Sequence, residues 1–317
     1  MHSENIHIKD LPTVDRPTYL NAAFLGKHTL WRYIAGIALI LIVWLVLGSI
    51  ATAVLLGIFA VLQGVSPTVL LDFSQSTSVL GYSANFLILN VSFLFLFGGI
   101  WLAVVAIHER PLRTLVTAMP KTDWRRIGYG GLIWLVLAAA SSLLEYLIWP
   151  DTFSYQLDLR ALLPFTILAL LFTPIQAASE ELLFRGYLMQ GSSLFTRNPI
   201  WLTLLSGLLF MLPHIFNPEM AVNFTIMAFS YFLFGAFLAW ISLKDGTTEL
   251  AIGAHITNNL FAALVVTFAE SAIPSPAIFF TTHFDPLFSL IAQIILFGVF
   301  YWFVFIRQKN RQTAPAL

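Results

Sequence analysis

Long apolar segments alternate with short polar ones along almost the whole chain. A bilayer core about 30 Å thick needs about 20 consecutive apolar residues in a helix. By that measure the sequence holds eight candidate spans, at about 33–62, 84–107, 127–149, 161–184, 199–215, 220–243, 249–269 and 286–306. The pattern therefore predicts an all-α fold, a polytopic membrane bundle of about eight transmembrane helices.

The chain contains no internal repeat, no low-complexity region and no long linker. One transmembrane domain is therefore expected at 33–306, between a cytoplasmic N-terminal tail at 1–32 and a cytoplasmic C-terminal tail at 307–317.

Composition agrees with a membrane protein and excludes several kinds of chemistry. Of 317 residues, 58% are hydrophobic and only 10% are charged, whereas a soluble domain carries about 25% charged residues. The absence of cysteine excludes disulfides, thiolate metal sites and a cysteine nucleophile. Because 16 basic residues balance 16 acidic ones, nothing predicts a nucleic-acid partner.

Positive charge is concentrated on one side of the predicted bundle. When the eight spans are placed in order, 14 of the 16 lysines and arginines fall on the side that holds both termini. Arg160 falls on the opposite side and Arg185 lies at the end of the fourth span. Since short cytoplasmic loops are enriched in positive charge, we expect an integral protein of the cell (inner) membrane with both termini in the cytoplasm.

The loop at 108–126 carries five of these basic residues, interleaved with apolar ones. It could lie along the anionic inner leaflet, although a plain loop that only sets topology is slightly favoured. His108 and Glu109 begin like the zinc motif H-E-x-x-H, but Leu112 stands where the second histidine is needed, so the motif is absent.

The stretch 171–190, LFTPIQAASEELLFRGYLMQ, places three ionisable side chains in or beside an apolar helix. Such groups cost several kcal/mol at membrane depth unless they are paired or face a wet cavity. Glu181 and Arg185 are four residues apart and can form an ion pair, while Glu180, about 100° around the axis, is free to face a cavity. Alternatively, both carboxylates lie at the wet end of the helix beside lipid headgroups. Pro174 can kink or open the helix upstream of the acids.

Two later spans add polar stripes at the same four-residue spacing. Phe210 and His214 share a face of the fifth span, and His255 and Asn259 share a face of the seventh. Each pair alone is compatible with capping or with hydrogen bonding between helices. Taken together, polar stripes on three helices predict one site. Glu145, close to the end of the third span, is interpreted as structural, with its carboxylate at the far interface.

This set of side chains is suited to hydrolysis of an acyl bond. Glu180 can take a proton from water that His214 orients. His255 and Asn259 can donate hydrogen bonds to a developing oxyanion. Glu180, His214 and His255 also match a known zinc ligand set with water in the fourth position. Spacing does not decide between the two; we favour direct activation of water and assign no cofactor, with zinc as the alternative.

The depths of Glu180 and His214 conflict in an idealised bundle. Glu180 lies near the end of its span, whereas His214 is about 22 Å along a helix that starts near Pro199. We therefore expect the fourth helix to continue past the acids and the fifth to begin outside the hydrocarbon, tilt, or break near Pro213.

The three motifs occur in a specific order: E-E-x-x-x-R at 180–185, F-x-x-x-H at 210–214 and H-x-x-x-N at 255–259. In that order they resemble the CPBP family of intramembrane proteases, also called the Abi or type II CAAX prenyl endopeptidase family. The resemblance covers about residues 108–268.

The resemblance implies a membrane-embedded peptidase with a conical active-site cavity that opens to the cytoplasm. It further implies a peptide or protein substrate at the bilayer and indicates no oligomeric state. The catalytic positions would be Glu180, His214, His255 and Asn259, and the supporting positions Glu181, Arg185 and Phe210.

Competing functions are less well supported. The chain has no H-E-x-x-H, no G-x-S-x-G and no aspartate pair within its spans, so other intramembrane protease chemistries lack their motifs. A transporter could use the same buried polar groups as an ion path, but inverted repeats and paired broken helices are not found. A non-catalytic immunity or scaffold protein would not need intact motifs. We therefore predict an endopeptidase that cuts a peptide bond near the membrane surface.

Overall fold

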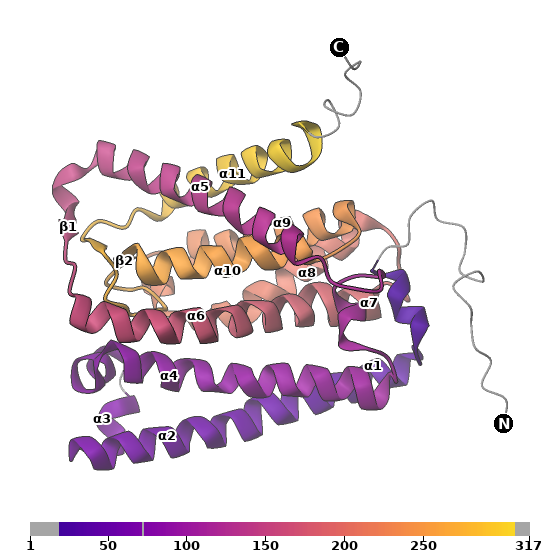
Figure 1. Ribbon diagram of the computed structural model, residues 1–317, viewed down its shortest axis with the longest axis horizontal. Coiled ribbons are helices and arrows are strands. Elements are labelled where there is room, and N and C mark those ends of the chain that lie inside the picture. The colour runs from indigo at the N-terminus through magenta and orange to yellow at the C-terminus, as the bar shows by residue number, and fades with distance from the viewer. Residues whose placement is uncertain (1–18, 72, 308–317) are drawn as a thin grey trace.

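The chain folds into a bundle of long helices that run side by side, as the computed structural model in Figure 1 shows. The structure describes residues 19–71 and 73–307; most of the two predicted tails, 1–18 and 308–317, lies outside the described residues. The helices of the first half are α1 (Leu30–Leu41), η3 (Ile42–Leu47), α2 (Gly48–Gln63), α3 (Pro67–Leu71), α4 (Phe73–Leu102), η4 (Ala103–Ile107) and α5 (Trp124–Ile148).

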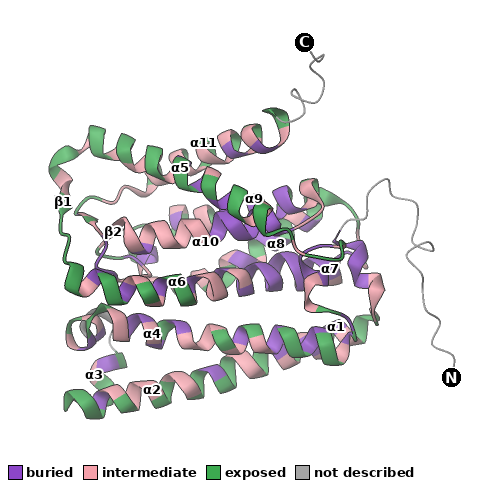
Figure 2. Ribbon diagram, viewed as in Figure 1, coloured by how far each residue is buried: buried purple, intermediate pink, exposed green. Residues whose placement is uncertain are grey.

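The second half supplies the remaining helices. They are α6 (Leu159–Glu181), η7 (Leu182–Leu188), α7 (Met189–Ser192), α8 (Pro199–His214), α9 (Phe224–Asp245), α10 (Glu249–Leu264), α11 (Pro286–Tyr301) and η9 (Trp302–Ile306). Exposed side chains run along much of α2 and α5 (Figure 2), whereas buried ones gather in η7 and in the first half of α10. This distribution is typical of apolar helices that face lipid around a packed interior.

The predicted all-α membrane fold is confirmed, with a difference in the lengths of two helices. Among the described residues, six helical segments are long and apolar enough to cross a membrane. The predicted spans at 199–215 and 249–269 correspond to α8 and α10, which have 16 residues each. At 1.5 Å per residue they are about 24 Å long, less than the core of a bilayer. A total of eight full spans stays a prediction.

A small sheet caps the end of the bundle opposite the described ends of the chain (Figure 1). Its strands are β1 (Phe153–Tyr155), β2 (Val266–Phe268) and β3 (Phe279–Thr281), in the order β1-β3-β2. β1 pairs antiparallel with β3, and β2 pairs parallel with β3. Because Val266–Phe268 join this sheet, the predicted helix over 249–269 ends early, at Leu264.

The other end of the bundle, called here the termini end, is closed by segments that the sequence predicted to be exposed. The residues before α1 include η2 (Asn21–Leu25), which packs with η5 (Leu112–Leu115) of the loop after α4. His108 and Arg110 in that loop are buried. The first half of the predicted 108–126 loop is thus part of the protein interior, and neither interpretation of it described this packing.

His108 holds this end together as a neutral side chain. Its Nδ1 lies 2.6 Å from the carbonyl oxygen of Lys27, and its Nε2 lies 2.8 Å from the hydroxyl of Tyr187. Since a carbonyl can only accept, Nδ1 carries the proton and Nε2 accepts from the tyrosine. Burial lowers the pKa of His108 to about 4, so the imidazole is neutral at pH 7.

Glycines allow α5 and α10 to approach closely enough for backbone contact. A Cβ atom on Gly253 would lie 1.9 Å from the carbonyl oxygen of Ile127, and one on Gly130 would lie 2.6 Å from that of Leu250. Small residues are the usual means of bringing membrane helices this close. The contact sets the position of α10, which carries the third predicted motif.

Replacing Gly253 with alanine should therefore separate these helices. We expect Gly253→Ala to destabilise the protein by about 1–3 kcal/mol, the usual range for overpacking a close contact, and to lower its melting temperature in detergent. The matched control is Gly128→Ala on the partner helix α5, because a Cβ atom at Gly128 meets nothing within 4 Å. Equal melting temperatures for the two variants would contradict the proposed contact.

Candidate active site

The helix that carries the two acids continues past them, as the depth argument requires. Asp158 caps its start by accepting a hydrogen bond from the Arg160 amide, and the α-helix runs without interruption through Pro174 to Glu181. There the winding changes to the π-helix η7 and then to α7, which ends at Ser192. π-Helical turns are rare and frequent at functional sites. The opening expected beside Pro174 is absent, and α8 ends at His214, just after Pro213.

Glu181 forms the predicted ion pair with Arg185 and has a second partner that sequence spacing did not identify. Its Oε1 accepts a hydrogen bond from Arg185 Nη1 at 2.8 Å and lies 2.7 Å from Nδ1 of His255. All three side chains are buried. Since a carboxylate only accepts, Nδ1 of His255 carries a proton, and the Nε2 edge of the ring is left to face the neighbouring acid.

Arg185 also contacts two further helices. Its Nη2 donates to the carbonyl oxygen of Gly235 in α9 at 3.0 Å. Its guanidinium carbon lies 4.4 Å from the centre of the Phe210 ring in α8, within the range of a cation–π contact. The supporting positions Glu181, Arg185 and Phe210 are thus one buried cluster beneath the site.

Glu180 points away from this cluster and into a cavity. Its Oε1 accepts a hydrogen bond from Gln176 Nε2 at 2.7 Å. Its Oε2 lies 3.6 Å from Nε2 of His255 and has no hydrogen-bond partner among the described residues. One oxygen is held in place, while the other is buried and leaves its hydrogen-bonding capacity unused. The prediction that Glu180 and Glu181 face different surroundings is confirmed by these contacts.

His214 is the last residue of α8, and its ring packs against the rings of Phe210 and Tyr231. Nδ1 is 2.7 Å from the carbonyl oxygen of Phe210, so this nitrogen must be the donor. The ring stacks on Tyr231 with centroids 4.3 Å apart and lies 4.4 Å from the ring of Phe210. In the neutral imidazole Nε2 is therefore an acceptor, suited to a water hydrogen.

Asn259 is linked to Glu180 through Gln176, a residue that the sequence argument missed. Asn259 Nδ2 donates to Gln176 Oε1 at 3.0 Å, and Asn259 Oδ1 accepts from Asn258 Nδ2 at 3.1 Å. Asn258 Oδ1 in turn accepts from the Trp134 indole at 3.2 Å. Gln176 precedes Glu180 by one helical turn, so the i,i+4 spacing was a signal that could have identified it.

All four predicted catalytic side chains line one cavity of about 550 Å³. It is formed by residues of α4, α5, α6, α8, α9, α10 and α11 together with the segments after α8 and α10. Glu145, expected at the far interface, also lines it. The cavity holds a further acidic group, Glu219, which follows α8.

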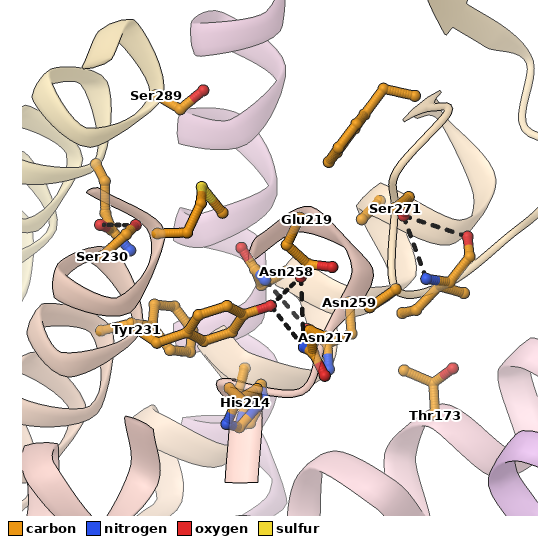
Figure 3. A pocket seen from close by; sticks show the side chains of 18 of the residues that line it. Thr173, His214, Asn217, Glu219, Ser230, Tyr231, Asn258, Asn259, Ser271 and Ser289 are labelled. Carbon is orange, nitrogen blue, oxygen red and sulfur yellow. Dashed lines mark hydrogen bonds between the residues drawn. The ribbon is translucent and has the colours of Figure 1, made fainter. Parts of the chain in front are cut away.

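Glu219 forms a second polar cluster on the cavity wall, close to His214 (Figure 3). One of its oxygens accepts hydrogen bonds from the Tyr231 hydroxyl and from Asn217 Nδ2, while Oε2 has no partner among the described residues. Burial raises the pKa of Glu219, although these two hydrogen bonds act in the opposite direction. Neither Glu219 nor Tyr231 has a motif spacing that would have identified it from the sequence.

The cavity reaches away from the end of the bundle that holds the described ends of the chain (Figure 1). It extends from Glu180 toward the end of the bundle that carries the sheet, and its lining includes Phe268 and Ser271 beside β2. The chain ends described by the structure lie at the opposite end (Figure 1). The cytoplasmic opening of the cavity and the cytoplasmic termini both stay predictions.

The predicted zinc alternative does not fit this arrangement. Across residues 19–71 and 73–307, no group of three or more histidine, cysteine, aspartate or glutamate side chains is placed to hold a metal ion. The set Glu180, His214 and His255 is included in that statement. The chemistry below is therefore derived from protein side chains and water.

Comparison with known proteins places these motifs in a family. The model of the Type II CAAX prenyl endopeptidase Rce1-like family matches residues 160–261, a range that contains all seven predicted site residues. The chain is 34% identical over 285 residues to "Uncharacterized protein YyaK" of Bacillus subtilis (strain 168), covering 88% of this chain and 93% of that protein. No solved structure matches the chain. The protein belongs to the Rce1-like family of type II CAAX prenyl endopeptidases.

Proposed function

We propose that the protein is an intramembrane endopeptidase that hydrolyses a peptide bond near the membrane surface. The observation that carries the proposal is the unpaired, buried carboxylate oxygen of Glu180, a residue that lines the same cavity as two imidazoles and an amide. General bases must lie within hydrogen-bond reach of the proton that they accept, either directly or through one water. This arrangement supports attack by a water molecule on a substrate carbonyl.

In the proposed mechanism Glu180 takes a proton from water through its free oxygen Oε2. His214 orients the same water by accepting a hydrogen bond from its other hydrogen at Nε2, because Nδ1 already donates to the backbone carbonyl of Phe210. The carboxylate then passes its proton to the leaving amine, as expected for a base that becomes an acid in the second step. The hydrogen bond from Gln176 holds the other carboxylate oxygen in position throughout.

His255 and Asn259 are proposed to stabilise the oxyanion of the tetrahedral intermediate. The Glu181 carboxylate accepts from Nδ1 of His255, which fixes the ring with its Nε2 edge toward Glu180; when protonated, Nε2 can donate to negative charge. Asn259 uses one amide hydrogen for Gln176 and keeps the other. Donors fixed in place before the reaction are the most effective ones in a site that excludes bulk water.

We further propose that the protein lies in the cell membrane with both termini in the cytoplasm. The basic residues described at the termini end support this orientation, because cytoplasmic segments are rich in lysine and arginine. They include Lys27, Arg113, Lys121, Arg125, Arg126, Arg197 and Lys244.

Replacing Glu180 with glutamine should abolish cleavage while preserving the fold. The amide keeps the side-chain volume but cannot accept the proton, so we expect a loss of about 10²-fold or more in kcat, typical of removing a general base. Purified wild type and Glu180→Gln would be compared in detergent against a peptide library, with and without a chelator. Cleavage by both proteins would refute the role of Glu180, and inhibition by the chelator would refute metal-free chemistry.

Glu181 and Glu180 should differ in their effects on stability. Glu181→Ala leaves Arg185, which is fully buried, without its counter-charge, a change that typically costs about 3–5 kcal/mol. Glu180→Ala removes one hydrogen bond at a cavity wall and should cost about 1 kcal/mol. Thermal unfolding in detergent measures both, and equal melting temperatures would contradict these roles. Adding Arg185→Met to Glu181→Ala should recover part of the loss.

Gln176 is expected to act as a positioning residue. Gln176→Leu removes the hydrogen bonds to Glu180 and Asn259 and should lower kcat about tenfold or more, because misplaced catalytic groups are costly, with little change in KM or melting temperature. The matched control is Gln293→Leu, since Gln293 also lines the cavity but bonds to Ser230 rather than to the site. A similar loss of kcat in both variants would show that Gln176 has no special role.

A further inference from the structure

The histidine that is proposed to orient water lies where its helix ends. His214 is the last residue of α8, directly after Pro213, which has no backbone N–H to donate. Because helix ends fray, an imidazole at this position needs support from outside the helix. The hydrogen bond from Nδ1 to the carbonyl oxygen of Phe210 stays within the same last turn. A neighbouring element must therefore hold the ring if Nε2 is to keep one direction.

Tyr231 in α9 supplies this support. Its ring stacks on the imidazole of His214 with centroids 4.3 Å apart and an angle of 29° between the planes. The tyrosine hydroxyl accepts a hydrogen bond from Asn217 Nδ2 at 2.9 Å and donates one to the carboxylate of Glu219, as Figure 3 shows. A phenol can both donate and accept, and here it does both. The tip of the tyrosine is thus fixed while its face packs on the imidazole.

Asn217 joins the histidine and the tyrosine from the segment after α8. Its backbone N–H donates to the carbonyl oxygen of His214 at 3.0 Å, and its side chain donates to the hydroxyl of Tyr231. One residue therefore fixes both the main chain of His214 and the aromatic side chain that stacks on the His214 ring. The contacts form a closed circuit around the end of α8.

Glu219 anchors this circuit at a position that is unfavourable for a carboxylate. The residue is only 5% exposed, and the side chains that donate to it, Tyr231 and Asn217, are neutral. Among the described residues that line the cavity there is no lysine or arginine. Burying a carboxylate without a cationic partner is costly, so an apolar side chain would serve stability better. Groups that break such rules are typical of functional sites.

We propose that Glu219 and Tyr231 are positioning residues for His214. Tyr231 holds the plane of the imidazole, and Glu219 holds Tyr231 through the hydroxyl. Neither residue belongs to the three sequence motifs. The effect on the reaction rests on the proposed function, in which Nε2 of His214 orients the attacking water, whereas the effect on the ring of His214 rests on the contacts alone.

The kinetic test separates a hydrogen-bond acceptor from a charge. We expect Tyr231→Phe and Glu219→Leu each to lower kcat about tenfold with little change in KM, because displaced catalytic groups slow the reaction without weakening substrate binding. Glu219→Gln should stay within about threefold of wild type, because its amide oxygen can still accept from the hydroxyl. The measurement uses a library peptide that the wild type cleaves, with melting temperatures taken in the same detergent.

Two further variants complete the kinetic test. Tyr231→Phe combined with Glu219→Leu should be about as slow as either single variant, because both changes break the same hydrogen bond. Ser230→Ala is the matched control, since Ser230 also lies in α9 and lines the cavity, but its hydroxyl bonds to Gln293. It should keep the wild-type kcat. A loss in Glu219→Gln as large as in Glu219→Leu, or an equal loss in Ser230→Ala, would overturn the proposal.

NMR spectra of protein with isotope-labelled histidine report on the ring of His214 without any substrate. Its signals are identified by their loss in His214→Ala. In the wild type we expect a single tautomer with the proton on Nδ1, as the hydrogen bond to the Phe210 carbonyl requires. In Tyr231→Phe and Glu219→Leu these signals should shift or broaden as the ring takes further orientations, and in Glu219→Gln they should match the wild type.

The two measurements distinguish failure of this inference from failure of the proposed function. Unchanged His214 signals in Tyr231→Phe would refute the positioning role, and so would altered signals with an unchanged kcat; either result leaves the peptidase in place. Signals that change as expected in a protein whose wild type cleaves no peptide would refute the peptidase and leave the positioning of the ring in place. If Glu219→Leu fails to fold, Tyr231→Phe and Glu219→Gln decide the outcome.

Discussion

The structure depends on one buried carboxylate, that of Glu181, which accepts hydrogen bonds from an arginine and from a histidine. Glu181 accepts from Arg185 and from His255 with the same oxygen, and Arg185 continues to α9 and to the Phe210 ring in α8. Removing charges from water costs several kcal/mol for each ion, which only close pairing offsets. Because these partners belong to different helices, the charge can be buried only when α6, α8, α9 and α10 are correctly packed. The cluster thereby fixes the relative positions of the three motifs.

Two neighbouring glutamates acquire different properties from this arrangement. Glu181 is enclosed by Arg185 and His255, while Glu180, one residue earlier on the helix, lines the cavity with one oxygen unpaired. Enzymes commonly assign different roles to paired carboxylates through their surroundings. The hydrogen bonds that begin at Trp134 and pass through Asn258, Asn259 and Gln176 all run in one direction. Each amide donates onward, so Glu180 is the final acceptor.

The sequence predicted what depends on local spacing and missed what depends on tertiary packing. The Glu181–Arg185 pair follows from four-residue helical spacing, and the apolar spans follow from segment length. By contrast, His255 meets Glu181 from 74 residues away, and Tyr231 reaches Glu219 from the start of a different helix. No periodicity encodes these contacts. The 108–126 loop was misjudged because its basic residues suggested a surface, whereas Arg110 is buried between the loop and η2.

The short lengths of α8 and α10 explain why the cavity lies on one side of the site. α8 stops at His214, and α10 stops five residues after Asn259, so neither extends to the sheet end. In a bilayer, backbone groups at a helix end must find partners or water. Here Pro218–Ala221 of η8 and the segment that follows β2 fold into the vacated end of the bundle and supply the polar groups of Glu219 and Ser271. A wet cavity beside truncated helices satisfies the helix ends and admits the water that the reaction consumes. If either helix were lengthened into a full span, it would fill the cavity and exclude the water that the reaction consumes.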